Sequence, residues 1–386
     1  MSDNAKKILI FSTSYIPRIG GAELAIKHIT DRLPNYEFHL ITSRYDSSLP
    51  AEEIIGNVRV FRVGGRWSLA YFFLPKLFFP LVAFRWALKF DKQFGPYDLT
   101  FSLQASQAGG AAWLFKLFRP KIPLLLNLQE GQDLGRQSIL KRFFRRRIIR
   151  SADHVTAISA YLKTIALQQG ASEKAISIIP NSADDAFFKV TKSTPGSEAL
   201  KQKLGIIAGD RVIISISRLV SKNGLDILLR ALPSAKIPSL KVLLVGSGGQ
   251  EQELRALVRD LGIQRHVLFA GSVPNEQLPA YLAIADVFIR PSRSEGLGIS
   301  FLEAMAAGVP VIGTPVGGIP DFLKDGETGL LCQSNDPTSL ARAIDRLFGD
   351  ERLRTSIVER ARALMEKDYR WKSIAQNYDR IFQELL

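Results

Sequence analysis

The stretch from Asp286 to Cys332 constrains the fold of this chain more than any other part of the sequence. It alternates short apolar runs with a Pro/Ser/Gly loop and a compact helical segment. The expected elements are a buried strand at Asp286–Ile289, a loop at Arg290–Gly298, a helix at Ile299–Ala307 with Gly308 at its C′ position, and a buried strand at Val309–Gly313. Since successive strands of such a unit run parallel, the loop is expected at the carboxyl edge of a sheet, where open α/β folds bind ligands.

Two carboxylates in this stretch are candidate ligand contacts. Glu295 lies in the loop, and Glu303 follows on the first turns of the helix. A carboxylate accepts hydrogen bonds from two neighbouring hydroxyls, so one glutamate would suit a ribose and the other a sugar, with a phosphate bridge between them. Gly296 and Gly298 allow close backbone approach, and the helix N-terminus favours an anion. The alternative is an ordinary βαβ unit with two surface glutamates.

The ordered string resembles the donor-site signature of the family-4 retaining glycosyltransferases. That signature has a Pro-Ser pair, a Glu, seven residues, a second Glu and then Gly-Gly-x-Pro. The matching positions here are Pro291-Ser292, Glu295, Glu303 and Gly317-Gly318-Ile319-Pro320. The resemblance implies that Glu303 binds the ribose, that Glu295 binds the transferred sugar, and that the loop Gly296-Leu297-Gly298 lines the donor site.

Length and composition favour a two-domain globular protein. A chain of 386 residues is too long for one compact core, and 46% hydrophobic with 23% charged residues is ordinary for this class. The single cysteine, Cys332, excludes an intramolecular disulfide and fits a reducing compartment. Four scattered histidines give no metal-site spacing, so neither a metal nor another cofactor is expected. The apolar run near the N-terminus is too short for a signal peptide.

The first half of the chain is expected to build a parallel sheet with a phosphate-binding turn. Its predicted strands are Lys7–Ser12, Glu37–Thr42, Val58–Val63, Asp98–Leu103, Pro123–Leu128, His154–Ser159 and Ile176–Ile179. Gly20 and Gly21 follow the first strand at the start of a helix, where bare N–H groups and the helix dipole can contact phosphate. The family carries a Gly-Gly-x-Glu loop here, which Gly20, Gly21 and Glu23 match.

The loop after the predicted strand Pro123–Leu128 departs from the family. Related proteins often have a histidine here, near the sugar and the acceptor, whereas this chain has Gln129 or Glu130. Glu130 is therefore the candidate catalytic residue on the acceptor side. Alternatively, Glu130 and Asp133 cap the helix that follows.

Two stretches of the first half combine basic and apolar residues. Residues 1–190 contain 26 Lys and Arg against 15 Asp and Glu, whereas residues 191–386 contain 25 against 22. Trp67–Phe90 is aromatic and apolar, but Pro75, Lys76 and Pro80 argue against a membrane span. This stretch is either a helix pair half buried against the sheet or an interfacial segment in contact with lipid. Together with the basic helix at 141–150, it predicts a peripheral association with an anionic membrane surface.

The second half is expected to hold the donor cations. Lys189–Glu198 is polar and aperiodic, which favours an interdomain linker. Arg218 and Lys222 follow the predicted strand Arg211–Ser217, and such groups grip phosphate oxygens. The family holds its donor diphosphate with an Arg and a Lys at this spacing; the alternative is a pair of solvated loop cations.

The sequence thus predicts an α/β protein with two doubly wound Rossmann-like domains facing a cleft, at residues 1–188 and 199–368. By resemblance this is the GT-B fold, with a C-terminal helix at 369–386 crossing back to the first domain. The implied enzyme is a retaining, metal-independent hexosyltransferase of the cytoplasm or the inner membrane face. Its donor would be a UDP- or GDP-linked sugar and its acceptor a glycan or lipid-linked molecule.

The expected catalytic residues are Glu295, Arg218, Lys222 and Glu130. Developing negative charge on the leaving diphosphate would be the main catalytic need. Three other functions remain open from sequence: a nucleotide-sugar epimerase or hydrolase of the same architecture, a basic nucleic-acid-binding protein, and an inactive scaffold. No nucleic-acid-binding motif supports the second of these.

Overall fold

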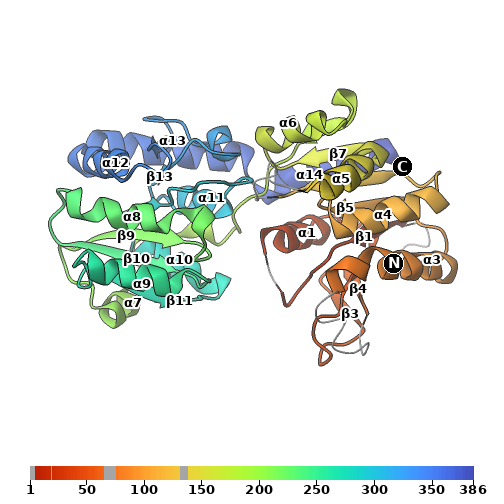
Figure 1. The fold of residues 1–386 in the computed structure, drawn as a ribbon, viewed down its shortest axis with the longest axis horizontal. Coiled ribbons are helices and arrows are strands. Elements are labelled where there is room, and N and C mark those ends of the chain that lie inside the picture. The colour runs from red at the N-terminus through yellow and green to blue at the C-terminus, as the bar shows by residue number, and fades with distance from the viewer. Residues whose placement is uncertain (1–4, 19, 65–74, 131–137) are drawn as a thin grey trace. The chain divides into compact units, whose positions relative to one another are not determined.

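The computed structural model describes residues 5–18, 20–64, 75–130 and 138–386. It divides into two compact units, Met1–Asn181 with Trp371–Leu386, and Ser182–Arg370 (Figure 1). The segment Lys189–Glu198, expected as a linker, lies inside the second unit. Val190 and Ser197 of this segment are buried, and the preceding 3₁₀ turn Phe187–Lys189 buries both of its aromatic side chains.

The first unit is built on one twisted sheet in the order β3-β4-β2-β1-β5-β6-β7-β8. All neighbouring strands pair in parallel except β3, which runs antiparallel to β4 at the edge. The strands are β1 (Lys6–Phe11), β2 (Tyr36–Ser43), β3 (Glu52–Ile55), β4 (Val58–Val63), β5 (Leu99–Leu103), β6 (Leu124–Leu128), β7 (His154–Ala157) and β8 (Ile176–Ile178). The seven predicted strands are confirmed, and β3 is an addition that the sequence analysis missed.

Helices cover both faces of this sheet because its strands are apolar on both sides. Ile8 and Ile10 pack beneath α1 and α14, whereas Leu9 and Phe11 pack beneath α3 and α4. Residues of α5 join β6 and β7 in a smaller cluster. The helices are α1 (Gly21–Asp31), α3 (Pro75–Gln93), α4 (Gln107–Phe118), α5 (Ile139–Ser151), α6 (Ala160–Gln168) and α14 (Trp371–Leu385).

The part of Trp67–Phe90 that the structure describes forms one helix, α3, with Pro80 inside it. Residues 65–74 lie outside the described part of the chain. Phe79, Ala83, Ala87 and Phe90 recur at nearly helical spacing and are buried against the sheet. Among the described helices, none has the combined length and apolar character needed to cross a bilayer.

The C-terminal helix α14 belongs to the first unit. Trp371 stacks on His28 of α1 with ring centroids 4.6 Å apart, and the Tyr36 hydroxyl donates a 2.6 Å hydrogen bond to Asp379 Oδ1. Asn127 Nδ2 of β6 donates to the Tyr378 hydroxyl at 2.8 Å. These contacts bring the last residues of the chain onto its first strands.

The second unit has a fully parallel sheet in the order β11-β10-β9-β12-β13-β14. Its strands are β9 (Arg211–Ile216), β10 (Leu240–Val245), β11 (Val267–Gly271), β12 (Val287–Ile289), β13 (Val311–Gly313) and β14 (Leu330–Leu331). Its helices are α7 (Ser197–Leu204), α8 (Leu225–Ala231), α9 (Glu251–Asp260), α10 (Leu278–Ala283), α11 (Ile299–Ala306), α12 (Pro337–Gly349) and α13 (Glu351–Asp368). The strand–loop–helix–strand unit at 286–313 is confirmed, while α8 and β14 were not expected.

Gly308 ends α11 as predicted. Its φ is 73°, and its N–H donates to Met305 O at 3.1 Å while Val309 N–H donates to Ala304 O at 2.9 Å. This pair of bonds is the Schellman arrangement, which satisfies the last carbonyl groups of a helix.

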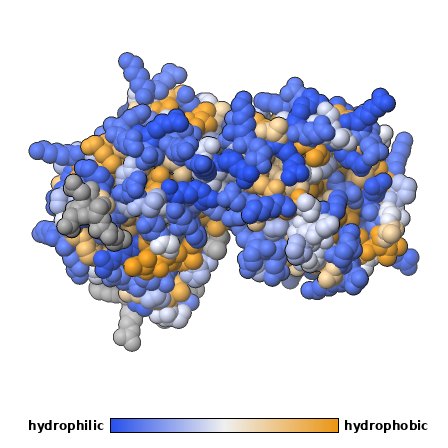
Figure 2. Space-filling view, turned by 180° about the vertical axis from the view of Figure 1, so that it is seen from behind, coloured by the Kyte–Doolittle hydropathy of each residue, from blue (hydrophilic) through white to orange (hydrophobic). Residues whose placement is uncertain are grey.

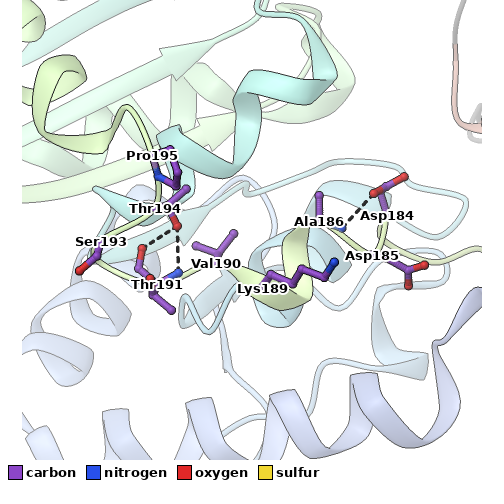
Figure 3. Close-up of a pocket in the computed structure, with 9 residues that line it drawn as sticks. All are labelled: Asp184, Asp185, Ala186, Lys189, Val190, Thr191, Ser193, Thr194 and Pro195. Carbon is purple, nitrogen blue, oxygen red and sulfur yellow. Dashed lines mark hydrogen bonds between the residues drawn. The ribbon is translucent and has the colours of Figure 1, made fainter.

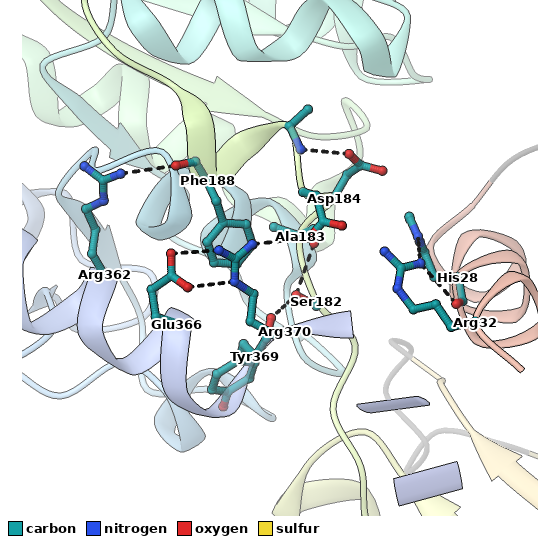
Figure 4. Close-up of polar contacts among 12 residues, drawn as sticks. His28, Arg32, Ser182, Ala183, Asp184, Phe188, Arg362, Glu366, Tyr369 and Arg370 are labelled. Atoms are coloured by element: carbon teal, nitrogen blue, oxygen red, sulfur yellow. Dashed lines mark hydrogen bonds and ion pairs between the residues drawn. The ribbon is translucent and has the colours of Figure 1, made fainter. Parts of the chain in front are cut away.

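The two ends of the second unit are tied to each other (Figure 4). The Ser182 hydroxyl donates to Tyr369 O, and Arg362 donates to Phe188 O at 3.3 Å. Arg370 forms an ion pair with Glu366 at 2.7 Å, and its guanidinium lies 3.7 Å from the centre of the Phe188 ring. The chain therefore enters and leaves this unit through adjacent, mutually bonded segments.

Packing of α14 is expected to stabilise the first unit. Phe382 is fully buried against Tyr36, Phe38, Phe101 and Tyr378, so Phe382→Ala should lower the free energy of unfolding by about 3–5 kcal/mol. Leu386→Ala is the matched control, because this side chain is 39% exposed. Urea unfolding of both variants checks this, and equal midpoints would contradict the buried placement of α14.

Candidate functional site

The predicted donor residues of the second unit lie at the carboxyl ends of two neighbouring strands. In the sheet, β9 is flanked by β10 on one side and by β12 on the other, so the connections leave β9 and β12 in opposite directions. Parallel α/β sheets open a ligand crevice at such a switch point. Arg218 and Lys222 follow β9, and Glu295 follows β12, so the structure brings these loops to one place.

The Arg290 side chain makes several hydrogen bonds at the carboxyl end of β12. Its side chain is 7% exposed, and its three nitrogens donate to the Glu295 carboxylate at 2.8 Å, to Ser300 Oγ at 2.8 Å and to Ser292 Oγ at 3.2 Å. The guanidinium also lies 4.8 Å from the centre of the Phe301 ring. A planar guanidinium with a hydrogen bond from each of its three nitrogens fixes its carboxylate partner in one orientation.

A second arginine joins the two loops. Arg293 makes a bidentate pair with Asp226, with N–O distances of 2.8 and 2.7 Å. Its backbone N–H donates to Lys222 O at 2.7 Å, and Nη1 donates to Ser221 O at 2.7 Å. The loop after β9 is therefore held against the loop after β12 by side-chain and main-chain bonds.

Two glycines let the backbone pack tightly around Glu295. Gly298 has φ of 99°, and a Cβ there would lie 3.0 Å from Arg290 Nη2. Gly317 has φ of 57°, and its Cβ would lie 1.7 Å from the backbone oxygen of Glu295. Only glycine fits both the conformation and the space, which gives the Gly-Gly-x-Pro segment a steric role at the site.

Glu303 sits in the second turn of α11 as a buried carboxyl. Burial raises its pKa to about 7, the positive charge of Arg290 opposes this rise, and the negative charge of Asp184 adds to it. No described residue hydrogen-bonds to its side chain. Buried carboxylates normally have such partners, so this group carries an unfilled bonding capacity.

The site carries a surplus of positive charge. Lys222 Nζ lies 3.6 Å from Glu295 Oε1, and the side chain is 25% exposed. Burial lowers the pKa of Lys222, Glu295 raises it, and the positive charges of Arg290 and Arg218 lower it further. Arg218 itself is exposed, and its carbonyl accepts from Asn223 Nδ2 at 2.7 Å. Three cations, Arg218, Lys222 and Arg290, thus lie near the carboxylate of Glu295 and the buried carboxyl of Glu303, whose pKa is raised.

The remaining predicted residues belong to the first unit. Gly20 is the N-cap of α1 in an extended conformation, and no side chain caps this helix. The Ser14 hydroxyl donates to Glu23 Oε1, and a Cβ on Gly20 would lie 2.7 Å from Glu23 Oε2. The Gly-Gly-x-Glu loop therefore folds back on its own first turn, with the N–H groups of Gly21 and its neighbours at the helix start.

Glu130 follows β6 but does not cap the helix after it. Its Oε1 accepts from Ala105 N at 2.9 Å and lies 3.5 Å from the buried Arg145, whereas α5 starts at the N-cap Ser138. Its Oε2 is buried and has no hydrogen-bond partner among the described residues. Asp133, the other capping candidate, lies outside the described residues. Glu130 thus steadies the turn after β5, where Gln104 has the uncommon φ of 66°.

Arg290 is not among the residues predicted for the site, although it directly precedes the Pro291-Ser292 pair. The available signal was a charged residue directly after the apolar run of β12, at a sheet edge already predicted to bind ligand. A separate hollow of about 440 Å³ lies along residues 184–195, and none of the predicted site residues lines it (Figure 3). Within the described part of the chain, no group of three His, Cys, Asp or Glu is placed to hold a metal ion.

Comparisons with known proteins agree with this geometry. Residues 196–364 match the family described as glycosyl transferases group 1, and residues 19–187 match glycosyltransferase family 4. A GDP-mannose-dependent alpha-(1-6)-phosphatidylinositol monomannoside mannosyltransferase of Mycobacterium tuberculosis is 31% identical over 281 residues, which are 69% of this chain and 72% of that protein. The Mycolicibacterium smegmatis protein of the same name is 34% identical over 63% of this chain and 65% of its own length.

A solved structure of similar fold is that of the Anabaena protein HepE in complex with UDP and glucose. Its TM-score is 0.81 at 23% identity, with 98% of this chain and all of that chain covered (100%). Two parallel-sheet α/β units are common to both proteins. This chain belongs to the family-4 glycosyltransferases of the GT-B fold.

Proposed function

We propose that this protein transfers a hexosyl group, with retention of configuration, from a nucleotide diphosphate-sugar to an acceptor. The observation that carries the proposal is the surplus of positive charge around a clamped Glu295 and an unpartnered, buried Glu303. A diphosphate-linked sugar complements this arrangement. Its two phosphates are negative partners for the cations, and its hydroxyl groups can donate hydrogen bonds to the carboxyls.

In this proposal, Lys222 and Arg218 neutralise the diphosphate as its bond to the sugar breaks. The N–H groups at the start of α11, which no side chain caps, add to this stabilisation. Arg290 is a positioning residue, since it orients the Glu295 carboxylate toward the sugar without needing to touch it. Glu303 accepts from the ribose hydroxyls. No step requires a metal ion, because the cations of the chain perform the charge stabilisation.

Loops of each unit contribute further backbone groups to this proposal. Gly20 and Gly21 of the first unit offer N–H groups to a phosphate, and Gly296, Leu297 and Gly298 of the second unit border the sugar. Glu130 stays the acceptor-side candidate, and the feature that supports this role is its buried Oε2, which has no partner among the described residues. The donor is proposed to be UDP- or GDP-linked, in line with the GDP-mannose dependence named for the mycobacterial relatives.

The acceptor is proposed to be a glycan or a lipid-linked molecule at a membrane surface. The named relatives act on a phosphatidylinositol mannoside. Hydrophobic residues reach the surface in patches between hydrophilic ones, as Figure 2 shows for one face of the molecule. A peripheral position on the inner face of the cytoplasmic membrane, through 67–90 and 141–150, would bring the enzyme to such acceptors.

Loss of a donor contact should reduce turnover strongly. Lys222→Ala is expected to lower kcat by about 100-fold, the usual effect of removing one group that stabilises a developing oxyanion. Transfer from a panel of UDP- and GDP-sugars, measured with and without acceptor, checks this and separates transfer from hydrolysis or epimerisation. Lys367→Ala, at an exposed position of α13, is the control. Equal activity of the two variants would contradict the assignment of Lys222.

The buried carboxyl of Glu303 should make stability depend on pH. The pKa of Glu303 is near the ordinary glutamate value of 4.5 in the unfolded chain and about 7 in the folded one, so between these values the folded state holds an extra proton. Stability should therefore fall as pH rises from 5 to 8, by at most about 3 kcal/mol for a shift of this size.

Glu303→Gln removes that ionisation while keeping the shape of the side chain. Thermal unfolding should show this variant close to the parent protein at pH 5 and more stable than it at pH 8. The exposed Glu359→Gln is the control and should follow the parent at both values. Parallel curves for all three proteins would show that Glu303 titrates normally.

A further inference from the structure

The exposed apolar side chains of the described residues are not evenly spread. Twelve large hydrophobic side chains are exposed, and eight of them lie on or at the ends of α3, α4 and α5. These eight are Phe78, Leu81, Leu117, Phe118, Ile139, Leu140, Phe143 and Phe144. The three helices cover the same side of the first sheet (Figure 1), so these residues belong to one surface of the first unit.

The outer side of α5 is strongly basic as well as apolar. The helix has no acidic residue, and only one of its arginines, Arg145, is buried and paired with a carboxylate. Its exposed cations are Lys141, Arg142, Arg146, Arg147 and Arg150. Ile139 and Leu140, at its start, are 86% and 65% exposed. Such a helix combines the two features of a segment that lies in a membrane interface.

A groove between α4 and α5 gathers three of these cations. It has a volume of about 470 Å³ and is lined by Trp113, Phe143, Arg146, Arg147, Arg150 and Ser151. The Arg147 guanidinium lies 5.2 Å from the centre of the Phe143 ring. Arg150 lies over Gly170, where a Cβ would come within 2.5 Å of its Nε. The contact with Phe143 thus positions the guanidinium group of Arg147, and the close approach to Gly170 positions that of Arg150.

The three arginines of the groove have no counter-ion in the described part of the chain. No carboxylate oxygen of the described residues lies within 4.0 Å of their guanidinium nitrogens. Guanidinium groups bind phosphate oxygens in bidentate fashion, and three of them around one hollow suit a phosphate group better than a single carboxylate. The exposed aliphatic Ile139 and Leu140 can neither stack on bases nor bond to phosphates, so they favour a lipid over a nucleic acid.

We propose that the groove between α4 and α5 is a binding site for the phosphate headgroup of an anionic membrane lipid. Arg146, Arg147 and Arg150 bind the phosphate, while the exposed apolar residues at the start of α5 enter the acyl boundary. The site deepens the proposed membrane location of the enzyme and rests on it, but it does not depend on the donor-site roles.

Vesicle sedimentation of the full chain tests this site. The protein should bind vesicles that contain phosphatidylglycerol and not vesicles of phosphatidylcholine alone. Replacing the three arginines with glutamine (R146Q/R147Q/R150Q) should weaken binding by about 100-fold. The control R259Q/R352Q/K367Q removes the same charge from exposed positions of the second unit and should change binding by less than about threefold.

Further measurements identify the ligand and show whether the triple variant folds. Ile139→Ser with Leu140→Ser should weaken binding most at high salt, where the charges are screened. Unchanged thermal unfolding of the triple variant establishes that it folds, and unchanged donor hydrolysis separates this site from the proposed reaction. The proposal is overturned if the two triple variants bind phosphatidylglycerol vesicles equally, or if the parent protein binds both kinds of vesicle equally. It is also overturned if R146Q/R147Q/R150Q loses binding to single-stranded RNA but keeps its vesicle binding.

Discussion

The ion pair between Arg290 and Glu295 is the contact on which the candidate donor site depends. Both side chains are nearly buried, at 7% and 11% exposure, so neither charge is well solvated without the other. Removing one partner of such a pair typically costs about 3–5 kcal/mol, because the remaining charge stays in a medium of low polarity. Ser292 and Ser300 then occupy the other guanidinium nitrogens, which leaves Glu295 one defined orientation. For the recognition of a specific sugar, the fixed orientation of Glu295 matters more than the small net contribution of the ion pair to stability.

Much of the second unit could be predicted from sequence, because its signals are local. The apolar run of β12, the glycine at position 308 and the spacing of Glu295 and Glu303 each reflect one element and its immediate neighbours. Arg290 could not be predicted in this way, since its partners Ser300 and Phe301 come together only when α11 packs on β12. The division of the chain after Asn181 likewise depends on contacts between distant residues, and the polar composition of 189–198 gives no sign that Val190 is buried.

The buried carboxyl of Glu303 is a feature that selection for stability alone would not favour. A partnerless buried carboxyl is held in the folded chain although glutamine would fit the same space without an ionisation penalty. The two glycines at 298 and 317 also raise the entropy of the unfolded chain, which disfavours folding. Such local costs collect at ligand sites, where the bound molecule supplies the missing partners. Their concentration at the edge of β12 therefore separates this edge from an ordinary βα connection.

The two proposed anion sites solve the same electrostatic problem in different ways. At the donor site, Lys222 and Arg290 are partly or fully buried and share one carboxylate, Glu295, so part of their charge stays available for a diphosphate. In the groove of α4 and α5, the arginines stay at the surface, where water already solvates them and no carboxylate is needed. A buried, preorganised site discriminates between ligands of different shape, whereas an exposed basic surface attracts any anionic bilayer. The donor site therefore suits the recognition of one substrate, whereas the basic groove suits attachment to a membrane surface.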